Sequence, residues 1–224
     1  FRWAGRYEKS MGDAITLDTQ LNVFADFHPQ IPDDLRDSPF VFLANIDPDL
    51  QLEVLQQMRA PRLTALDSMN YWMAHKRASL TRAMSMVDIV LLNESEVRLY
   101  AGDENLLAAA RTVLDLGPRA LVIKRGEHGS LLLVHGDGQE LGLFVAPAYP
   151  VDPVVDPTGA GDTFAAGLMG YLAHSRDLSL GGLRRAMAHG SVVASFTVQG
   201  FGTERLQTLT LSDIEQRYRA LCAL

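Results

Sequence analysis

Short apolar runs alternate with amphipathic stretches over most of the chain, from about residue 40 onward. Val41-Phe42-Leu43-Ala44 is an unbroken apolar run, which is typical of a strand that is buried on both faces. Asp47-Pro48 then provides the N-cap and the first-turn proline of a helix over residues 50–58. The pattern therefore predicts a strand followed directly by a helix.

The same unit of a strand and a helix recurs further along the chain. More strands are predicted at residues 63–66, 89–92 and 120–123. More helices are predicted at residues 76–86, 94–100 and 104–116. Strands that alternate with helices imply a mostly parallel sheet that helices cover on both faces. We therefore predict an α/β fold with a doubly wound, mostly parallel sheet flanked by helices.

Two segments depart from this alternation. Residues 131–134 and 141–145, joined through Gly136-Asp137-Gly138, predict a β-hairpin. Residues 1–24 alternate bulky and polar side chains at the spacing of half-exposed strands, which predicts a small antiparallel β-layer. Nothing resembling a linker separates this layer from residues 25–224, so we expect one fold unit. The last predicted helices cover residues 158–174, 179–198 and 211–223.

Composition and charge narrow the class of protein. The chain has 224 residues, of which 47% are hydrophobic and 21% charged, and its formal net charge is −7. Such a chain can bury a sizeable core, but it lacks the apolar stretch of about 20 residues that a bilayer span needs. Its negative charge offers no field that gathers phosphate backbones. We therefore expect neither a membrane protein nor a nucleic-acid-binding protein.

Cysteine usage and the first residues bear on the cellular compartment. Cys222 is the only cysteine, so it cannot form an internal disulfide. The sequence opens on Phe1 without a basic and then apolar leader. We therefore expect a cytoplasmic protein.

The stretch from Asp156 to Gly167 is the most informative about the chemistry of the protein. Gly159-Ala160-Gly161 stands at the start of a predicted helix, where free backbone N–H groups and the helix dipole together favour an anion. Asp162 is unexpected there, because a carboxylate repels a bound phosphate. A general base that accepts a proton from an attacking hydroxyl would explain it. The alternative is an ordinary capped turn in which Asp162 only complements the helix dipole.

This stretch resembles the C-terminal signature of the ribokinase-like (PfkB) carbohydrate and nucleoside kinases. Three further segments resemble the family in order and spacing, namely residues 93–96, 122–130 and 188–202. Four ordered matches are more specific than any single one. The resemblance implies a ribokinase-like fold in which the β-layer of residues 1–24 is a lid over the substrate.

The resemblance also implies a reaction, the transfer of the γ-phosphate of ATP to a hydroxyl of a sugar or sugar-like molecule. Asp162 would be the base, and the N–H groups of Gly159, Ala160 and Gly161 would stabilise the transferred phosphoryl group. Magnesium would be held by Glu96 through water, and potassium by Asp156 and Thr158. The residues that would bind the nucleotide are Asn93, Glu96, Lys124, Gly126, Glu127, Gly129, Thr158 and His189.

Several of these residues have simpler interpretations. Asn93 and Glu96 are also spaced as a helix-capping pair. Lys124 and Arg125 are also typical of a solvated loop, and His189 in an apolar helix is also typical of a core histidine. The segment that begins at Asp67 partly resembles the Asp-x-Asn-x-Arg segment of keto-deoxy-gluconate kinases, but it lacks the arginine.

Three functions stay open on this basis. The first is a sugar kinase, the second is a nucleoside (adenosine-like) kinase of the same family, and the third is a catalytically impaired regulatory protein that binds nucleotides. Family members begin with strands and a Gly-Gly segment that bind the acceptor. Since these are absent from the sequence, we expect either a further N-terminal segment or an unusual acceptor site. The exposed edges of the β-layer predict a homodimer formed through it.

Overall fold

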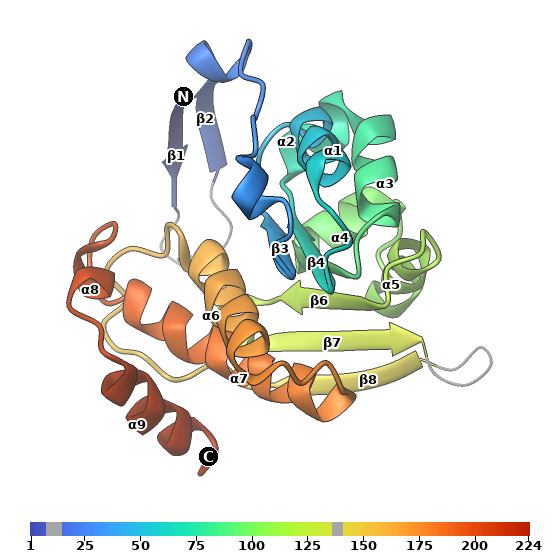
Figure 1. Ribbon diagram of the computed structural model, residues 1–224. Coiled ribbons are helices and arrows are strands. Elements are labelled where there is room, and N and C mark those ends of the chain that lie inside the picture. The colour runs from blue at the N-terminus through green and yellow to red at the C-terminus, as the bar shows by residue number, and fades with distance from the viewer. Residues whose placement is uncertain (8–14, 136–140) are drawn as a thin grey trace.

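The body of the protein is built on one six-stranded sheet (Figure 1). The computed structural model describes residues 1–7, 15–135 and 141–224. The strands run in chain order across the sheet, and the first four are parallel, whereas the last two are antiparallel to their neighbours. They are β3 (Phe40–Leu43), β4 (Leu63–Asp67), β5 (Ile89–Asn93), β6 (Ala120–Lys124), β7 (Ser130–His135) and β8 (Leu141–Ala146).

Apolar runs form the central strands because both faces of the sheet are covered. In β5, Ile89 and Leu91 belong to one hydrophobic core, whereas Val90 and Leu92 belong to the other. All four side chains are almost completely buried. The mostly parallel α/β sheet is therefore confirmed, and so is the hairpin of β7 and β8, although Gly136-Asp137-Gly138 lies outside the described residues.

Helices cover the two faces in different ways. The five helices that connect the parallel strands pack on one face, as right-handed crossovers between strands in chain order require. They are α1 (Pro48–Gln57), α2 (Asn70–His75), α3 (Arg77–Ser85), α4 (Glu94–Ala101) and α5 (Leu106–Leu114). The opposite face is covered by α6 (Ala160–Ser175) and α7 (Leu180–Thr197), which follow β8 in the chain. The short helix α2 was not predicted.

Glycines bring α6 and α7 into close contact. A Cβ atom on Gly190 would lie 2.8 Å from the carbonyl oxygen of Phe164, and one on Gly167 would lie 2.8 Å from that of His189. Because each neighbouring atom is backbone, neither position has room for a side chain. This contact fixes the N-terminal end of α6 over the sheet.

Most of the remaining elements lie toward the two ends of the chain. The predicted antiparallel β-layer is confirmed as β1 (Arg2–Arg6) paired with β2 (Ile15–Gln20), and it stands apart from the main sheet (Figure 1). No helix in the described ranges is both long enough and apolar enough to cross a bilayer. The other helices are α8 (Glu204–Gln207), α9 (Leu211–Leu221) and the 3-10 turns η1 (Asn22–Phe24), η2 (Asp33–Leu35) and η3 (Gly126–His128).

The contact between α6 and α7 leads to a stability prediction. Gly190→Ala should lower the free energy of unfolding by about 1–3 kcal/mol, because its Cβ collides with backbone. Gly170→Ala is the matched control, since a Cβ there meets nothing within 4 Å. That variant should be as stable as the parent or up to about 1 kcal/mol more stable, because alanine favours the helix. Urea titration measures both, and equal effects would contradict the proposed close contact.

Candidate active site

Polar side chains gather where three parallel strands end. Asp67, Asn93 and Lys124 are the last residues of β4, β5 and β6. By the alternation of the strands, all three lie on the face that α6 covers. The N-terminus of α6 lies at the same edge, because a Cβ on Gly161 would be 3.2 Å from Nζ of Lys124. In open α/β sheets ligands bind at the carboxyl ends of the strands, so this edge is the candidate active site.

The glycine-rich segment forms the first turn of α6. Gly159 is the N-cap residue and has φ of +80°, in the left-handed region that favours glycine. The N–H of Ala160 donates to the carbonyl of Pro157 at 3.1 Å. In the part of the chain that the structure describes, the N–H groups of Gly161 and Asp162 donate to no protein acceptor. The N–H of Gly159 likewise donates to no acceptor among the described residues, so the free donors are those of Gly159, Gly161 and Asp162, whereas that of Ala160 is already used.

Asp162 lies in this first turn, among other charged groups. Its carboxylate acts electrostatically on both Lys124 and Asp67, which places it in the same cluster. The structure thus brings Asp162 together with the strand-end residues, as its expected role requires. A carboxylate at a helix N-terminus beside an ammonium group is chemically able to accept a proton from a hydroxyl.

Asp67 and Lys124 form an ion pair at the bottom of the site. The distance from Nζ to Oδ2 is 2.5 Å, and only 3% of the Asp67 side chain and 16% of the Lys124 side chain are exposed. Burial alone would lower the pKa of Lys124, but the carboxylates of Asp67, Glu96 and Asp162 raise it above its ordinary value. Lys124 is therefore an ammonium group inside the protein. The interpretation of Lys124 as part of a solvated loop is wrong.

Arg125, the neighbour of Lys124, has a different environment. Its Nε donates to Glu94 at 2.6 Å, and about a third of its side chain is exposed. Hydrogen bonds from Arg98 and Arg125 lower the pKa of Glu94, which therefore remains ionised. The side chain of Arg125 thus braces the start of α4.

Asn93 and Glu96 form a reciprocal capping box at the start of α4. Asn93 Oδ1 accepts from the N–H of Glu96, and Glu96 Oε2 accepts from the N–H of Asn93, each at 2.7 Å. The capping interpretation is therefore confirmed. The same contacts fix the Glu96 side chain at the edge of the sheet, where its charge reaches Lys124. Capping and a role toward magnesium are compatible, and the second stays a prediction.

The loop after β6 begins at the same edge. Residues 126–128 form η3, in which Glu127 is exposed. Gly129 has φ of +83°, and a Cβ there would lie against the carbonyl oxygen of Ala146. Close backbone contact thus explains this glycine, and a role of Gly126, Glu127 and Gly129 toward a nucleotide stays a prediction.

A second loop lies against the segment that precedes α6. The N–H of Val155 donates to the carbonyl of Val198 at 2.7 Å, and Asp156 accepts from the N–H groups of Thr158 and Gly202. Burial would raise the pKa of Asp156, but these hydrogen bonds lower it, so the group is a carboxylate. No three His, Cys, Asp or Glu side chains cluster as metal ligands among residues 1–7, 15–135 and 141–224. The potassium site at Asp156 and Thr158 stays a prediction.

His189 lies in α7 between two tyrosine rings. The centroid of its ring is 4.4 Å from that of Tyr171 and 4.3 Å from that of Tyr218, and the planes are nearly parallel. Both faces of the imidazole are therefore covered by protein. This arrangement favours a core histidine over a neighbour of adenine.

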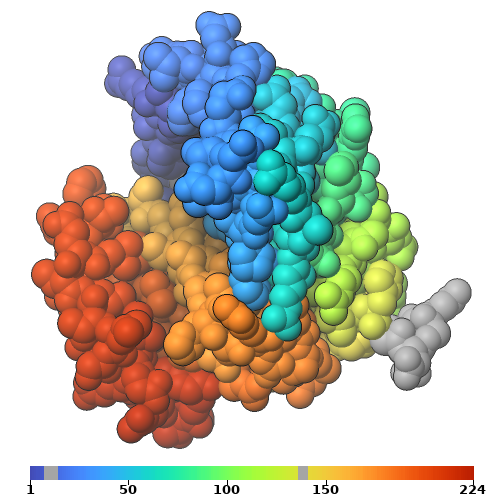
Figure 2. Space-filling view, in the orientation of Figure 1, coloured from blue at the N-terminus to red at the C-terminus, as the bar shows by residue number. Residues whose placement is uncertain are grey.

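The β-layer of residues 1–24 reaches the glycine-rich segment. The hydroxyl of Thr158 donates to that of Tyr7 at 3.1 Å, which joins the end of β1 to the loop before α6. Figure 2 shows the blue N-terminal segment and the red C-terminal helices on either side of a recess. A cavity of about 190 Å³ lies between the layer and the body. It is lined by Phe1, Thr19, Leu21, Phe24, Asn45, Ile46, Asp47, Met69, Tyr71 and Trp72.

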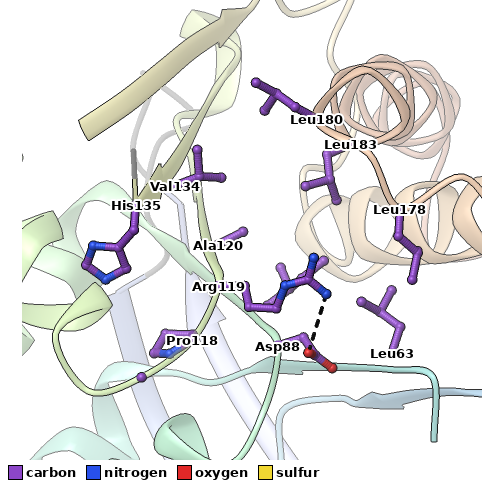
Figure 3. Close-up of a pocket in the computed structure, with 12 residues that line it drawn as sticks. Leu63, Asp88, Pro118, Arg119, Ala120, Val134, His135, Leu178, Leu180 and Leu183 are labelled. Carbon is purple, nitrogen blue, oxygen red and sulfur yellow. Dashed lines mark ion pairs between the residues drawn. The ribbon is translucent and has the colours of Figure 1, made fainter. Parts of the chain in front are cut away.

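A larger cavity of about 510 Å³ lies at the opposite end of the sheet. Leu178, in the connection between α6 and α7, and Leu180 and Leu183, in the first turn of α7, face the first residues of β4, β5 and β6 there (Figure 3). Its charged pair is Arg119 with Asp88, 3.9 Å apart. None of the residues that the sequence singled out lines this cavity, so its volume does not make it the active site.

Comparison with protein families and curated proteins gives two matches of note. Residues 25–209 match the profile of the pfkB family carbohydrate kinases. The cytidine kinase of Thermococcus kodakarensis is 35% identical to this chain over 152 residues. The matched segment covers 66% of this chain and 52% of the relative, so the chain spans about half the length of that protein.

Solved structures share the fold at low sequence identity. The nucleoside kinase of Methanocaldococcus jannaschii, a member of the ribokinase family, matches with a TM-score of 0.72 and 20% identity over 93% of this chain and 64% of its own. Ribokinase II of E. coli in complex with ATP and Mg²⁺ matches with a TM-score of 0.67 and 20% identity over 84% and 61%. These likenesses confirm the ribokinase-like fold.

The stacked histidine leads to a prediction about pH. Burial lowers the pKa of His189 below its ordinary value of 6.5, so the folded protein binds this proton less readily than the unfolded chain. Its contribution to stability is complete above about pH 6.5 and is lost as the pH falls toward the folded pKa. His189→Phe keeps a stacked ring without a titrating group. Its free energy of unfolding should therefore fall less than that of the parent between about pH 7.5 and 5.5. Identical pH profiles would contradict this assignment.

Proposed function

The chain belongs to the pfkB family of carbohydrate kinases, and on that premise we propose that it transfers the γ-phosphoryl group of ATP to a hydroxyl of a small molecule. One observation carries this proposal. The free N–H groups of Gly161 and Asp162, the ammonium of Lys124 and the carboxylate of Asp162 meet at one helix N-terminus. Donors for an anion and an acceptor for a proton are the two requirements of this reaction.

Each residue of the site has one role in the proposed phosphoryl transfer. The carboxylate of Asp162 accepts the proton of the acceptor hydroxyl, whose oxygen forms the new bond to the γ-phosphorus. The bond from that phosphorus to the bridging oxygen breaks, and ADP leaves with the electron pair. The N–H groups of Gly161 and Asp162 hold the oxygens of the group in transfer. Positioning and charge stabilisation provide most of the rate in such reactions.

The charges of the site fit a magnesium ion. Asp67, Glu96 and Asp162 are three carboxylates around the single ammonium of Lys124, which leaves an excess of two negative charges. Carboxylate oxygen is a preferred ligand of Mg²⁺, which also retains much of its water. We therefore propose that Glu96, braced by Asn93, holds the ion through water. The ion would neutralise charge on the phosphates when bound.

A monovalent cation would lie on the other side of the glycine-rich segment. The carboxylate of Asp156 and the loop backbone around Thr158 and Gly202 are already drawn together by hydrogen bonds. Oxygen atoms can replace the hydration shell of a potassium ion. We propose that Asp156 and Thr158 contribute to such a site.

The cavity beneath the β-layer is the proposed acceptor site, and its walls favour a nucleoside over a free sugar. Four of its lining residues, Phe1, Phe24, Tyr71 and Trp72, are aromatic, and aromatic walls favour a planar base. The buried hydroxyl of Thr19, a residue of the cavity wall, has no hydrogen-bond partner among the described residues. A free sugar would leave most of its hydroxyl groups unpaired on such walls. The similarity of the chain to a cytidine kinase also supports a nucleoside as the acceptor.

Replacement of the proposed base tests the reaction. Asp162→Asn in the full-length protein should lower kcat by about 10²-fold or more and leave the affinity for Mg-ATP nearly unchanged, because the proton acceptor is lost. Release of ADP with an acceptor present gives kcat, and calorimetry gives the affinity.

Asp213→Asn is the matched control. Asp213 is the third residue of α9, as Asp162 is of α6, and it caps that helix through Thr210. Asp213→Asn should lower the free energy of unfolding by about 1 kcal/mol, because the helix cap is weakened, and it should leave kcat unchanged. If Asp162→Asn retained full kcat, the assignment of the base would be wrong.

The exposed face of β2 supports a dimer. Ile15 and Leu17 lie two residues apart on this strand, and they are 40% and 62% exposed. We propose that this face pairs with a second copy, since apolar strand faces at an edge favour association. Leu17→Glu should shift the protein from dimer to monomer in light scattering coupled to size-exclusion chromatography, whereas Leu107→Glu, which is 42% exposed on α5, should not. A parent protein that is already monomeric would refute the dimer.

A further inference from the structure

Asp67 is held more firmly than a surface carboxylate. It is 2% exposed, and its Oδ1 accepts from the N–H of Ser68 at 2.9 Å while its Oδ2 accepts from Lys124 at 2.5 Å. Its carbonyl oxygen accepts from the side chain of Gln51 at 3.0 Å, which ties the end of β4 to α1. The carboxylate therefore has one fixed position, from which it fixes the ammonium of Lys124.

The ammonium group of Lys124 lies at the N-terminus of α6, which is the unfavourable end of a helix for a cation. Its Nζ lies beside Gly161 in the first turn of α6, where the helix dipole is positive. Cations favour the opposite end of a helix, so this placement is unfavourable by itself. Two free N–H groups point from the same turn. The ammonium of Lys124 and the free N–H groups of the helix thus converge at one place, which suits an anionic group such as a phosphoryl group.

Stability alone does not account for the pair. Exchanging a buried ion pair for neutral side chains of similar volume is often neutral or stabilising. On this face the parallel strands are apolar up to their carboxyl edge, where the polar residues Asp67, Asn93 and Lys124 end them. A charge that is costly to bury and that lies beside the proposed base requires another reason.

We propose that Asp67 is a positioning residue that holds the ammonium of Lys124 beneath the first turn of α6, where Lys124 contacts the phosphoryl group in transfer. This inference rests on the proposed kinase function. Lys124 keeps its proton throughout, and its charge attracts the oxygens of the phosphoryl group as the bond to ADP breaks. Without Asp67, the flexible side chain of Lys124 turns toward Glu96 or Asp162, whose charges already act on it.

A double-variant cycle separates this role from a structural one. The variants are Asp67→Asn, Lys124→Met and the two combined, all in the full-length protein. Lys124→Met leaves a buried carboxylate without its cation and should unfold at clearly lower urea concentration. The double variant carries two neutral side chains and should recover most of that stability. Its kcat should nevertheless stay at least about 10-fold below that of the parent, with a smaller change in KM.

A binding measurement adds a readout that does not depend on turnover. Calorimetry compares Mg-AMPPNP, which has a γ-phosphoryl group, with Mg-ADP, which lacks it. In the double variant and in Asp67→Asn the affinity for Mg-AMPPNP should fall about 5-fold or more relative to that for Mg-ADP, because only the former reaches Lys124. Asp88→Asn is the control, since Asp88 binds Thr64 at the opposite end of the sheet. It should alter stability and leave this affinity ratio unchanged.

The outcomes are distinct. A double variant with the kcat of the parent and an unchanged affinity ratio would overturn the proposal and leave a purely structural pair. If the double variant fails to fold, the affinity ratio of Asp67→Asn decides, because this substitution keeps the shape of the side chain and an acceptor for the N–H of Ser68 but removes the oxygen that accepts from Lys124. Absence of turnover in the parent protein would refute the kinase function. In that case the ratio still decides whether Lys124 contacts a γ-phosphoryl group.

Discussion

The contact between the first turn of α6 and the side chain of Lys124 is the constraint on which the candidate site depends. Gly161 has no side chain, so the turn can approach to where a Cβ would be 3.2 Å from Nζ. The tight packing of α6 on α7 through Gly167 and Gly190 holds the helix there. Without this approach, the free N–H groups of the helix and the charged ends of β4 and β6 would not meet. The proposed site for a phosphoryl group therefore depends on where α6 begins.

Much of the fold follows from local patterns in the sequence. Unbroken apolar runs predicted β3 to β6, because a strand buried on both faces needs no polar side. The predicted helix of residues 179–198 appears as α7 within one residue at each end. The spacing of Asn93 and Glu96 predicted their capping box. Helix α2 was missed because the six residues Asn70–His75 have neither a side-chain cap nor a clear helical period.

The site was only partly predictable, because its decisive contacts join distant parts of the chain. The glycine-rich segment and Asp162 could be found from the local sequence motif. Asp67 could not, because its partner Lys124 is 57 residues away and no local pattern signals the pairing. The available hints were its place at the end of an apolar run and the partial resemblance of the segment that it begins to one of keto-deoxy-gluconate kinases. The hydrogen bond from the N–H of Ala160 to the carbonyl of Pro157 likewise depends on turn geometry that a sequence does not specify.

The measurement that tests the central claim most directly is phosphoryl transfer from Mg-ATP to a panel of nucleosides and sugars. The full-length protein is incubated with each acceptor, and both ADP and the phosphorylated product are quantified. We expect equal amounts of ADP and product with at least one acceptor, and more with nucleosides than with free sugars. Binding of Mg-ATP without transfer to any acceptor would contradict the kinase function and indicate a nucleotide-binding regulatory protein.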